Sequence, residues 1–411
     1  MDFAYPQAVE DFRSEVREFI NENWDDEIMD PRREGMAQLV DTPERREFMK
    51  KLAGRGWLGM TWPVEYGGKD MEGIYEYVLN EELASVGAPY IGKGVGIVGK
   101  TLIRHGSAEL KERFLPLILN AEIEWAIGYT EPEAGSDLAA LSMRAVRDQE
   151  HGGWRITGQK RFTTSAHFAE WYWLAVRTDP DVGKHKGVTL MVLPMDAEGI
   201  QVTDMPTIGD ERVNEVFLDD VFVPDNMVVG EVGKGFYYVS EALDFERFTL
   251  FTVSAYVNKY SFARDWVRTA ERDGKPLKDD PLVRAEIARL ATNVHAAKMI
   301  CAQVIAKAAS GEVPNIESAM FKLWATQIGQ EVADAALRWA GPAGALKRGA
   351  SNAPDDGRFE HSLRYTVVDT VGAGTSEVQR NIIARRGLGL PVNNGVVPTK
   401  KSPAKAPGAT S

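Results

Sequence analysis

The stretch Tyr129–Asp137 reads YTEPEAGSD, and the fold and chemistry of this chain are inferred outward from it. Thr130 and Ser136 supply hydroxyl groups, and Gly135 permits either a positive φ or the close approach of a ligand to the backbone. Backbone N–H groups in turns of this kind bind anions and carbonyl oxygens. Taken alone, however, the segment is explained more simply as an ordinary polar loop.

The chain changes character on both sides of this stretch. Residues 1–124 show apolar side chains at helical spacing, which predicts an N-terminal helical domain. Residues 125–234 hold short segments of β-branched and aromatic residues between Gly, Asp and Pro, which predicts a middle β-domain. Residues 235–390 are helical again, and the Pro-, Lys-, Ala- and Ser-rich tail 391–411 is expected to be disordered. Segregated helices and strands predict an α+β fold.

The patterns also predict individual elements. The expected helical segments are 9–23, 74–86, 95–105, 108–119, 236–272, 281–310, 318–339 and 376–386. The expected strands are 154–157, 171–177, 187–194, 200–204 and 215–222. The expected loops are 52–68, 273–280 and 341–358.

Composition excludes several classes of function. The 411 residues include 48 Lys and Arg against 60 Asp and Glu, a net charge of −12, so bulk attraction to nucleic acid or anionic membranes is not expected. The lone Cys301, in an apolar helical run, forms no disulfide framework, and neither cysteine nor histidine spacing predicts a metal site. No apolar run is long enough for a membrane span, and the N-terminus is unlike a signal peptide. A cytoplasmic protein is expected.

Two further segments contain candidate binding groups. In Gly158–Ser165, GQKRFTTS, strand alternation would put Phe162 and Thr164 on one face, where they could stack on and hydrogen-bond to a flat heteroaromatic ring. In Gly372–Arg380, GAGTSEVQR, small residues lead into a helix with Thr375 or Ser376 as N-cap. When each segment stands alone, a half-buried strand explains the first more simply, and a capped helix explains the second more simply.

Together, in this order and spacing, the three segments are far more specific. TEPEAGSD, the GQKRFTT strand, NEVFLDDVFVP at 214–224 and GAGTSEVQR resemble the signatures of the acyl-CoA dehydrogenase family. The resemblance runs from about Phe3 to Leu390. It implies an N-terminal helical domain, a middle β-domain and a C-terminal four-helix bundle, with FAD bound non-covalently between the last two.

The resemblance also implies the site residues. Ile127 to Thr130 and Ser136 would line the flavin ring and the thioester, Phe162 would replace the family's flavin-stacking Trp, and Thr164 would bond near flavin N5. The cofactor-binding residues implied are Ile127, Tyr129, Thr130, Ser136, Phe162, Thr163, Thr164, Arg272, Arg338, Thr375 and Glu377. The substrate-binding residues implied are Ser136, Asp244, Arg247, Gly372 and Ala373.

The implied reaction is α,β-dehydrogenation of an acyl-CoA thioester, which needs a general base at the α-carbon. Many family members place that Glu where this chain has Ala373. The isovaleryl-CoA dehydrogenase type instead places it in an L-D-x-E-R segment, which is Leu243–Arg247 here, so the resemblance implies Glu246 as the base. On a helix, Glu246 would share an apolar face with Ala242, Leu243, Leu250 and Val253 and would have no helical cation partner. A Glu paired across the bundle is the structural alternative.

Gly372 and Ala373 also imply a pocket for a branched, cyclic or bulky acyl group. In many family members a segment at this place reaches the FAD of a neighbouring subunit, but here the segment around Arg272 departs from the family pattern. Arg338 replaces a second FAD-contacting Gln. Both Arg residues are candidates for a pyrophosphate contact, and the departure leaves a homotetramer or a mixed tetramer open. Electron-transfer flavoprotein is the implied acceptor. The alternatives are a flavin monooxygenase or nitroalkane oxidase, a non-catalytic chain of a mixed tetramer, and an acyl carrier protein in place of CoA.

Overall fold

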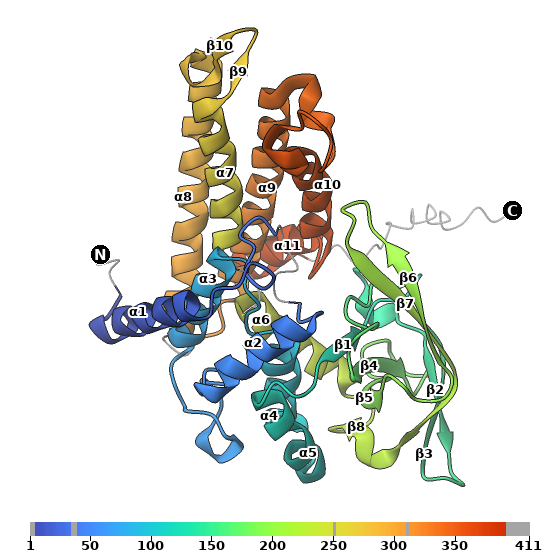
Figure 1. Ribbon diagram of the computed structural model, residues 1–411. Helices are drawn as coiled ribbons and strands as arrows, with labels where there is room; N and C mark the ends of the chain where they lie inside the picture. Colours follow the sequence, from blue (N-terminus) through green and yellow to red (C-terminus); the bar gives the residue numbers. More distant parts are fainter. Residues whose placement is uncertain (1–4, 34–38, 250–251, 310–311, 392–411) are drawn as a thin grey trace, which may run out of the picture.

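The computed structural model describes residues 5–33, 39–249, 252–309 and 312–391, without the side chains of 244–249 and 308–309. Helices, a β-region and further helices follow one another in chain order, which confirms the α+β prediction. Figure 1 shows the N-terminal helices and the sheet side by side, with the long C-terminal helices above them in this view. The limits of the three domains stay predictions.

The N-terminal part is helical because its apolar residues recur at helical spacing and are buried together. In the first helix, all five apolar positions from Val9 to Ile20 are buried. Thr42 and Ser107 cap two other helices by accepting backbone N–H groups. The elements are α1 (Gln7–Glu22), α2 (Pro43–Gly54), η1 (Val64–Tyr66), α3 (Gly73–Ser85), the π-helical η2 (Gly94–Gly99), α4 (Lys100–His105) and α5 (Ala108–Leu119).

The middle part is one sheet with the strand order β6-β7-β3-β2-β4-β5-β8, and β1 pairs parallel to β4. The inner strands are continuous apolar runs because both of their faces are covered. The elements are β1 (Trp125–Gly128), η3 (Leu138–Ala140), β2 (Arg144–Asp148), β3 (Gly153–Lys160), β4 (Trp171–Arg177), β5 (Val188–Pro194), β6 (Ile200–Pro206), β7 (Arg212–Pro224), η4 (Asp225–Met227) and β8 (Val228–Val229).

The C-terminal part is organised around one long helix, α9, which packs against α7, α8, α10 and α11. Shorter turns and a two-stranded ribbon lie between the long helices. The elements are α6 (Gly235–Thr249), α7 (Ser254–Thr269), β9 (Glu271–Arg272), β10 (Lys275–Pro276), η5 (Leu277–Asp279), α8 (Pro281–Ala309), α9 (Asn315–Ala340), η6 (Gly341–Ala345), η7 (Pro354–Gly357), α10 (Arg358–Val371), α11 (Ser376–Ile382) and the π-helical η8 (Ile383–Gly387).

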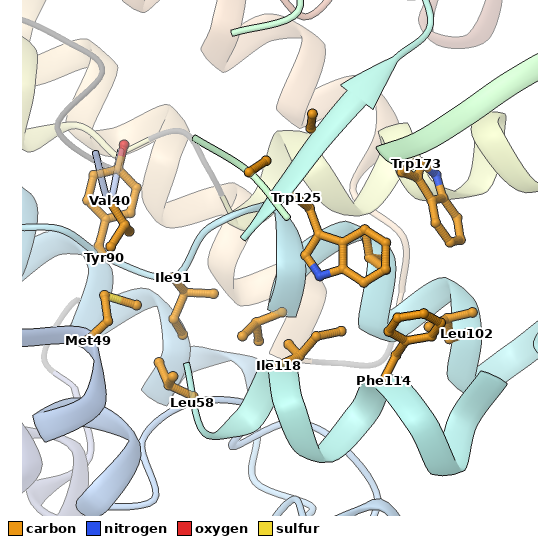
Figure 2. Close-up of a cluster of buried hydrophobic side chains, with 14 of the residues drawn as sticks. Val40, Met49, Leu58, Tyr90, Ile91, Leu102, Phe114, Ile118, Trp125 and Trp173 are labelled. Atoms are coloured by element: carbon orange, nitrogen blue, oxygen red, sulfur yellow. The ribbon is translucent and has the colours of Figure 1, made fainter. Parts of the chain in front are cut away.

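A shared apolar core joins the N-terminal helices to the sheet (Figure 2). The ring of Trp125 in β1 contacts two other aromatic rings. Its centroid is 5.3 Å from that of Phe114 in α5 and 6.2 Å from that of Trp173 in β4. Cys301 of α8 is buried as expected, its thiol donates to the Tyr77 hydroxyl at 3.4 Å, and burial raises the pKa of the thiol to about 12. The core therefore fixes the sheet rigidly beside the helices that surround it.

Three expectations about elements were wrong. The single periodic stretch 236–272 is two helices, α6 and α7, followed by β9. Helices α2 and α10 had no predicted counterpart. The strand expected through residue 165 ends at Lys160.

Two other expectations lie partly outside what the structure describes. Of the tail, only residue 391 is described, so the expected disorder of 392–411 stays a prediction. Among the described residues, no helix is both long enough and apolar enough to cross a membrane. The cytoplasmic location also stays a prediction.

Candidate active site

The YTEPEAGSD stretch leaves β1 and is fixed by the end of β3. The Lys160 ammonium, which is fully buried, donates to the Tyr129 carbonyl oxygen at 3.2 Å and to the Glu131 carboxylate at 2.8 Å. One residue later, the Arg161 N–H donates to the Thr130 carbonyl oxygen at 2.9 Å. The first two of the candidate segments are thus joined directly.

Glu131 completes this network from inside the loop. Its carboxylate also accepts the N–H groups of Ser142 and Met143, at 2.6 and 2.9 Å. Burial lowers the pKa of Lys160 to about 8, against the opposing effect of Glu131. Burial would raise the pKa of Glu131, but Lys160 and the backbone donors outweigh it, and the pKa is lowered. The pair is therefore ionised near neutral pH.

The rest of the loop faces outward. Two reasons for glycine at position 135 were expected, a positive φ and the close approach of a ligand. Gly135 does not lie in the left-handed region, so the first reason does not apply. A Cβ there would meet nothing within 4 Å, so only the approach of a ligand remains as a reason. Ser136 is exposed and Ile127 is half-buried, so both remain available to a ligand. The Tyr129 hydroxyl accepts the Trp173 indole N–H at 3.0 Å.

The GQKRFTTS segment corrects the predicted strand. Phe162 has φ of +56° and is 57% exposed, so it does not alternate with Thr164 along a strand. Thr164 is half-buried. Thr163 is fully buried and its hydroxyl lies 3.4 Å from the Tyr172 hydroxyl, so its side chain contacts the protein interior. Its role in cofactor binding stays a prediction.

The GAGTSEVQR segment forms the turn between α10 and α11. Thr375 is the N-cap, as predicted, and its hydroxyl accepts the Val378 N–H at 3.2 Å. Lys322 of α9 donates to the Gly374 carbonyl oxygen at 2.7 Å, and Gln379 donates to the same oxygen at 3.1 Å. Ala373 has φ of +52°, a conformation that only these surrounding contacts make tolerable for a non-glycine residue.

Gly374 and Glu377 differ in what their positions require. Gly374 has φ of +89°, and a Cβ there would lie 2.7 Å from the Gln379 amide nitrogen, so the position requires glycine. Glu377 is exposed and lies 3.5 Å from Arg380, which leaves its carboxylate at the surface of the chain.

The LDFER segment lies in the last turns of α6. This helix packs against η2 of the N-terminal part, β5 of the sheet and α9 of the bundle, so it lies where the three parts meet. The side chains of Glu246, Asp244 and Arg247 lie outside the described residues. Ala242 is buried, but Val253 follows the end of the helix, so the expected apolar face does not extend that far.

Arg272 belongs to the β9–β10 ribbon, which Figure 1 shows at one end of the C-terminal helices, and Arg338 lies near the end of α9. Arg272 donates to the Trp339 carbonyl oxygen at 2.9 Å, and Arg338 pairs with Glu286 at 2.5 Å. Sixteen residues separate Arg338 from Lys322 on α9, or about 24 Å of helix. Within one chain, neither Arg reaches the ligand site near the Gly374 turn, so a contact with FAD would be made to the cofactor of a neighbouring subunit, and this role stays a prediction.

Three residues that shape the site had no predicted role: Lys160, Lys322 and Asn214. Lys160 ends a strand inside a quoted motif, but it stands between Gln159 and Arg161, so no local pattern marks it as buried. Asn214 opens the NEVFLDDVFVP motif. Lys322 lies on a helix 50 residues before the turn that it stabilises, and no local pattern reveals it. Among the described residues, no group of His, Cys, Asp and Glu is arranged to hold a metal ion.

Comparisons with known proteins bear on this geometry. Family models match residues 6–122 (acyl-CoA dehydrogenase, N-terminal domain), 126–221 (middle domain) and 233–388 (C-terminal domain). Acyl-CoA dehydrogenase FadE26 of Mycobacterium tuberculosis is 31% identical, covering 96% of this chain and 100% of that protein. The solved structure described as Tcur3481-Tcur3483 steroid ACAD is 34% identical with a TM-score of 0.84, covering 95% and 100%. The ChsE4-ChsE5 complex from Mycobacterium tuberculosis is 31% identical with a TM-score of 0.84, also covering 95% and 100%.

Proposed function

The chain belongs to the acyl-CoA dehydrogenase family, and on that premise we propose that it desaturates a bulky acyl-CoA at the α,β bond with Glu246 as the base. It is an FAD-dependent oxidoreductase that acts on acyl-CoA. The observation on which the proposal chiefly rests is the exchange of carboxylate positions: Ala373 stands in the turn before Thr375, while α6 holds Glu246 where the three parts of the molecule meet.

The residues present fit a flavin. Phe162 exposes most of its ring, in a strained backbone conformation, beside the half-buried Thr164. An exposed aromatic face next to a hydroxyl suits stacking on, and hydrogen bonding to, a flat heteroaromatic ring. Tyr129, Thr130 and Ser136 would border the same ring. When bound, FAD supplies the hydride acceptor, which no protein side chain can replace.

The protein's own part is to move a proton and stabilise charge. We assign removal of the α-proton to the Glu246 carboxylate. Backbone N–H groups near Ala373 would donate to the thioester oxygen as negative charge develops there, and this role requires no side chain. Asp244 and Arg247, on the same turns of α6, would orient the substrate. The family's default acceptor, electron-transfer flavoprotein, would take up the electrons, and a cytoplasmic location suits that exchange.

Gly372 supports a bulky acyl group. Its φ is −62° and its ψ is 154°, an ordinary conformation that does not require glycine. A Cβ there would contact only the Val368 carbonyl oxygen, at 3.4 Å, so packing within the chain does not require glycine either. The missing side chain is therefore best explained as space beside the acyl chain.

The position of Arg338 supports an oligomer with shared sites. Arg338 lies about 24 Å of helix away from Lys322, and Arg272 contacts the neighbouring Trp339, so both would contact FAD held mainly by another chain. Two similar solved structures carry two chain names each, Tcur3481-Tcur3483 and ChsE4-ChsE5. We therefore favour a mixed tetramer with a related chain over a homotetramer.

Anaerobic reduction of the holoenzyme tests the substrate class. Straight, branched, cyclic and steroid-like acyl-CoAs are mixed with wild type and with Gly372→Leu, and the loss of flavin absorbance is followed. We expect the bulky thioesters to reduce wild type fastest and Gly372→Leu to lose those substrates selectively. Fastest reduction by short straight chains, with the same order in the variant, would contradict the bulky pocket.

A further inference from the structure

Asn214 is a buried polar residue next to the candidate flavin segment. It lies on β7, its side chain is fully buried, and it opens the NEVFLDDVFVP motif. A buried amide is costly unless its hydrogen bonds are satisfied, so its partners show what holds it there.

The strand pairing slips by one residue just where Asn214 lies. Lys160 of β3 pairs with Val216 of β7, and Arg161 forms an ion pair with the next β7 residue, Glu215, at 2.8 Å. Regular pairing would then set Phe162 against Asn214. Instead, the Thr163 N–H donates to the Asn214 carbonyl oxygen at 3.0 Å. The β3 side therefore has one extra residue.

Phe162 is that extra residue. A β-bulge leaves its extra residue unpaired and re-aims side chains, often beside active sites. This account explains why Phe162 has a positive φ and why its ring is exposed while Thr163 is buried. The bulge also takes the carbonyl groups of Thr163 and Thr164 out of the regular ladder.

The Asn214 amide satisfies those carbonyl groups. Its nitrogen donates to the Thr163 carbonyl oxygen at 2.8 Å and lies 3.4 Å from that of Thr164. Its oxygen accepts from the Arg212 guanidinium at 3.0 Å. Because a carbonyl only accepts and a guanidinium only donates, these partners define which end of the amide is which. The His167 Nδ1, 3.1 Å from the same nitrogen, accepts from it.

We propose that Asn214 is a positioning residue for the flavin, whose side-chain amide holds the Phe162 bulge open and fixes Thr164. Asn214 itself touches no reacting atom. The inference rests on the proposed function, since it takes Phe162 and Thr164 as the groups that contact the flavin ring.

Two variants and one control isolate the amide. Asn214→Asp keeps the shape but turns the donor nitrogen into an oxygen, which repels the two carbonyl groups. Asn214→Ser keeps a hydrogen-bond donor on a shorter side chain, and it replaces the first variant in the test if that variant fails to fold. Glu215→Gln, on the neighbouring β7 residue, removes the ion pair with Arg161 but leaves the amide in place.

The readouts are the dissociation constant for FAD, the visible circular dichroism of the bound flavin, and kcat and KM for the acyl-CoA. We expect Asn214→Asp to weaken FAD binding about tenfold or more, to change the dichroism, and to lower kcat more than it changes KM. Asn214→Ser should lie between it and wild type, and Glu215→Gln should stay within about twofold of wild type on each measure.

Two results would overturn the inference. A lower melting temperature with unchanged FAD affinity and dichroism in both Asn214 variants would make Asn214 merely structural. Equal effects of Glu215→Gln and Asn214→Asp would show that any change on β7 suffices. A wrong flavin site can be told apart from a wrong role for Asn214. If Phe162 and Thr164 do not contact the flavin, Phe162→Leu and Thr164→Val will leave FAD affinity and dichroism unchanged, even where the Asn214 variants alter them.

Discussion

At the residue scale, the Lys160–Glu131 pair shows how the molecule supports a polar loop from within. Both side chains are buried, and Lys160 also holds the Tyr129 carbonyl oxygen. Removing one member of a buried pair leaves an uncompensated charge, which costs more than the pair is worth. The pair is therefore a requirement for the shape of the loop rather than a source of surplus stability.

A double-mutant cycle checks this role. Lys160→Met should lower the free energy of unfolding by about 3 kcal/mol, because it leaves the Glu131 carboxylate buried without its cation. The double variant with Glu131→Gln should recover at least about 1 kcal/mol of that loss in denaturant melts. Simple addition of the two single effects would show that the residues do not interact.

Acid should weaken the same pair. The pKa of Glu131 is lowered in the folded chain, so its contribution to stability is complete above its ordinary value of 4.5 and is lost as pH falls through the folded pKa. The stability difference between wild type and Glu131→Gln should therefore shrink below about pH 4.5 in melts at a series of pH values. A constant difference down to pH 2 would rule out this linkage.

Local chemistry could be predicted at single residues, and long-range chemistry could not. Thr375 was correctly predicted as one of two candidate N-caps, because a cap depends on the few residues that follow it. Phe162 was wrongly placed on a strand face, because the strand ends at Lys160 and the residues that follow contact Asn214, some 50 residues later in the chain. The proposed roles of Glu246 and the other site residues stay predictions.

At the element scale, the β6–β7 hairpin docks on α10 and ties the sheet to the bundle (Figure 1). Arg364 of α10 donates to the Ile208 carbonyl oxygen at 2.6 Å and pairs with Asp210 at 2.7 Å. The His361 imidazole nitrogen lies 3.1 Å from the Gly209 carbonyl oxygen. The hairpin tip is thus fixed to one face of the helix.

Removal of this guanidinium should free the hairpin. Arg364→Leu should speed amide hydrogen exchange in residues 207–211 at least about tenfold and cost about 1.5–3 kcal/mol of stability. Arg348→Leu is the matched control, because its pair with Asp356 is exposed at 3.7 Å and should be worth about 1 kcal/mol or less. Unchanged exchange at the hairpin tip in Arg364→Leu would disprove the docking role.

The elements themselves were predictable where their patterns were long and regular. Strand 171–177 and helix 108–119 were placed as the structure has them, because a continuous apolar run marks the strand and helical periodicity marks the helix. The break between α6 and α7 was missed because apolar periodicity continues on both sides of it. Helix α10 gains its stability from packing against α9 and the hairpin, which a sequence does not display.

At the scale of the whole molecule, α9 sets the distance between two groups of candidate FAD residues. Lys322, near its start, supports the turn before Thr375, and Arg338 lies near its other end. Because a rigid helix cannot shorten this distance, we propose that residues at its two ends serve different copies of the site. The fold of one chain thus leads directly to a proposal about assembly.

Counting flavin per chain tests the shared site. Expressed alone, the chain should retain well under one FAD, and co-expression with a related chain that supplies the missing contacts should raise the content. Arg338→Ala in one chain should then lower the amount of flavin bound mainly by the other chain, while the Thr375 turn of the variant chain stays intact. Full flavin content in a monomer would contradict a site made by two chains.

The central claim is that Glu246 removes the α-proton. The most direct measurement is the anaerobic bleaching of bound flavin by a bulky acyl-CoA in wild type, Glu246→Gln and the control Glu241→Gln. Glu241 lies on the same helix and pairs with His105 at 2.6 Å, so its loss removes a carboxylate outside the proposed chemistry. We expect wild type and Glu241→Gln to bleach, and Glu246→Gln to bind FAD and substrate but to bleach at least about a thousandfold more slowly. Bleaching of Glu246→Gln at the wild-type rate would contradict the account.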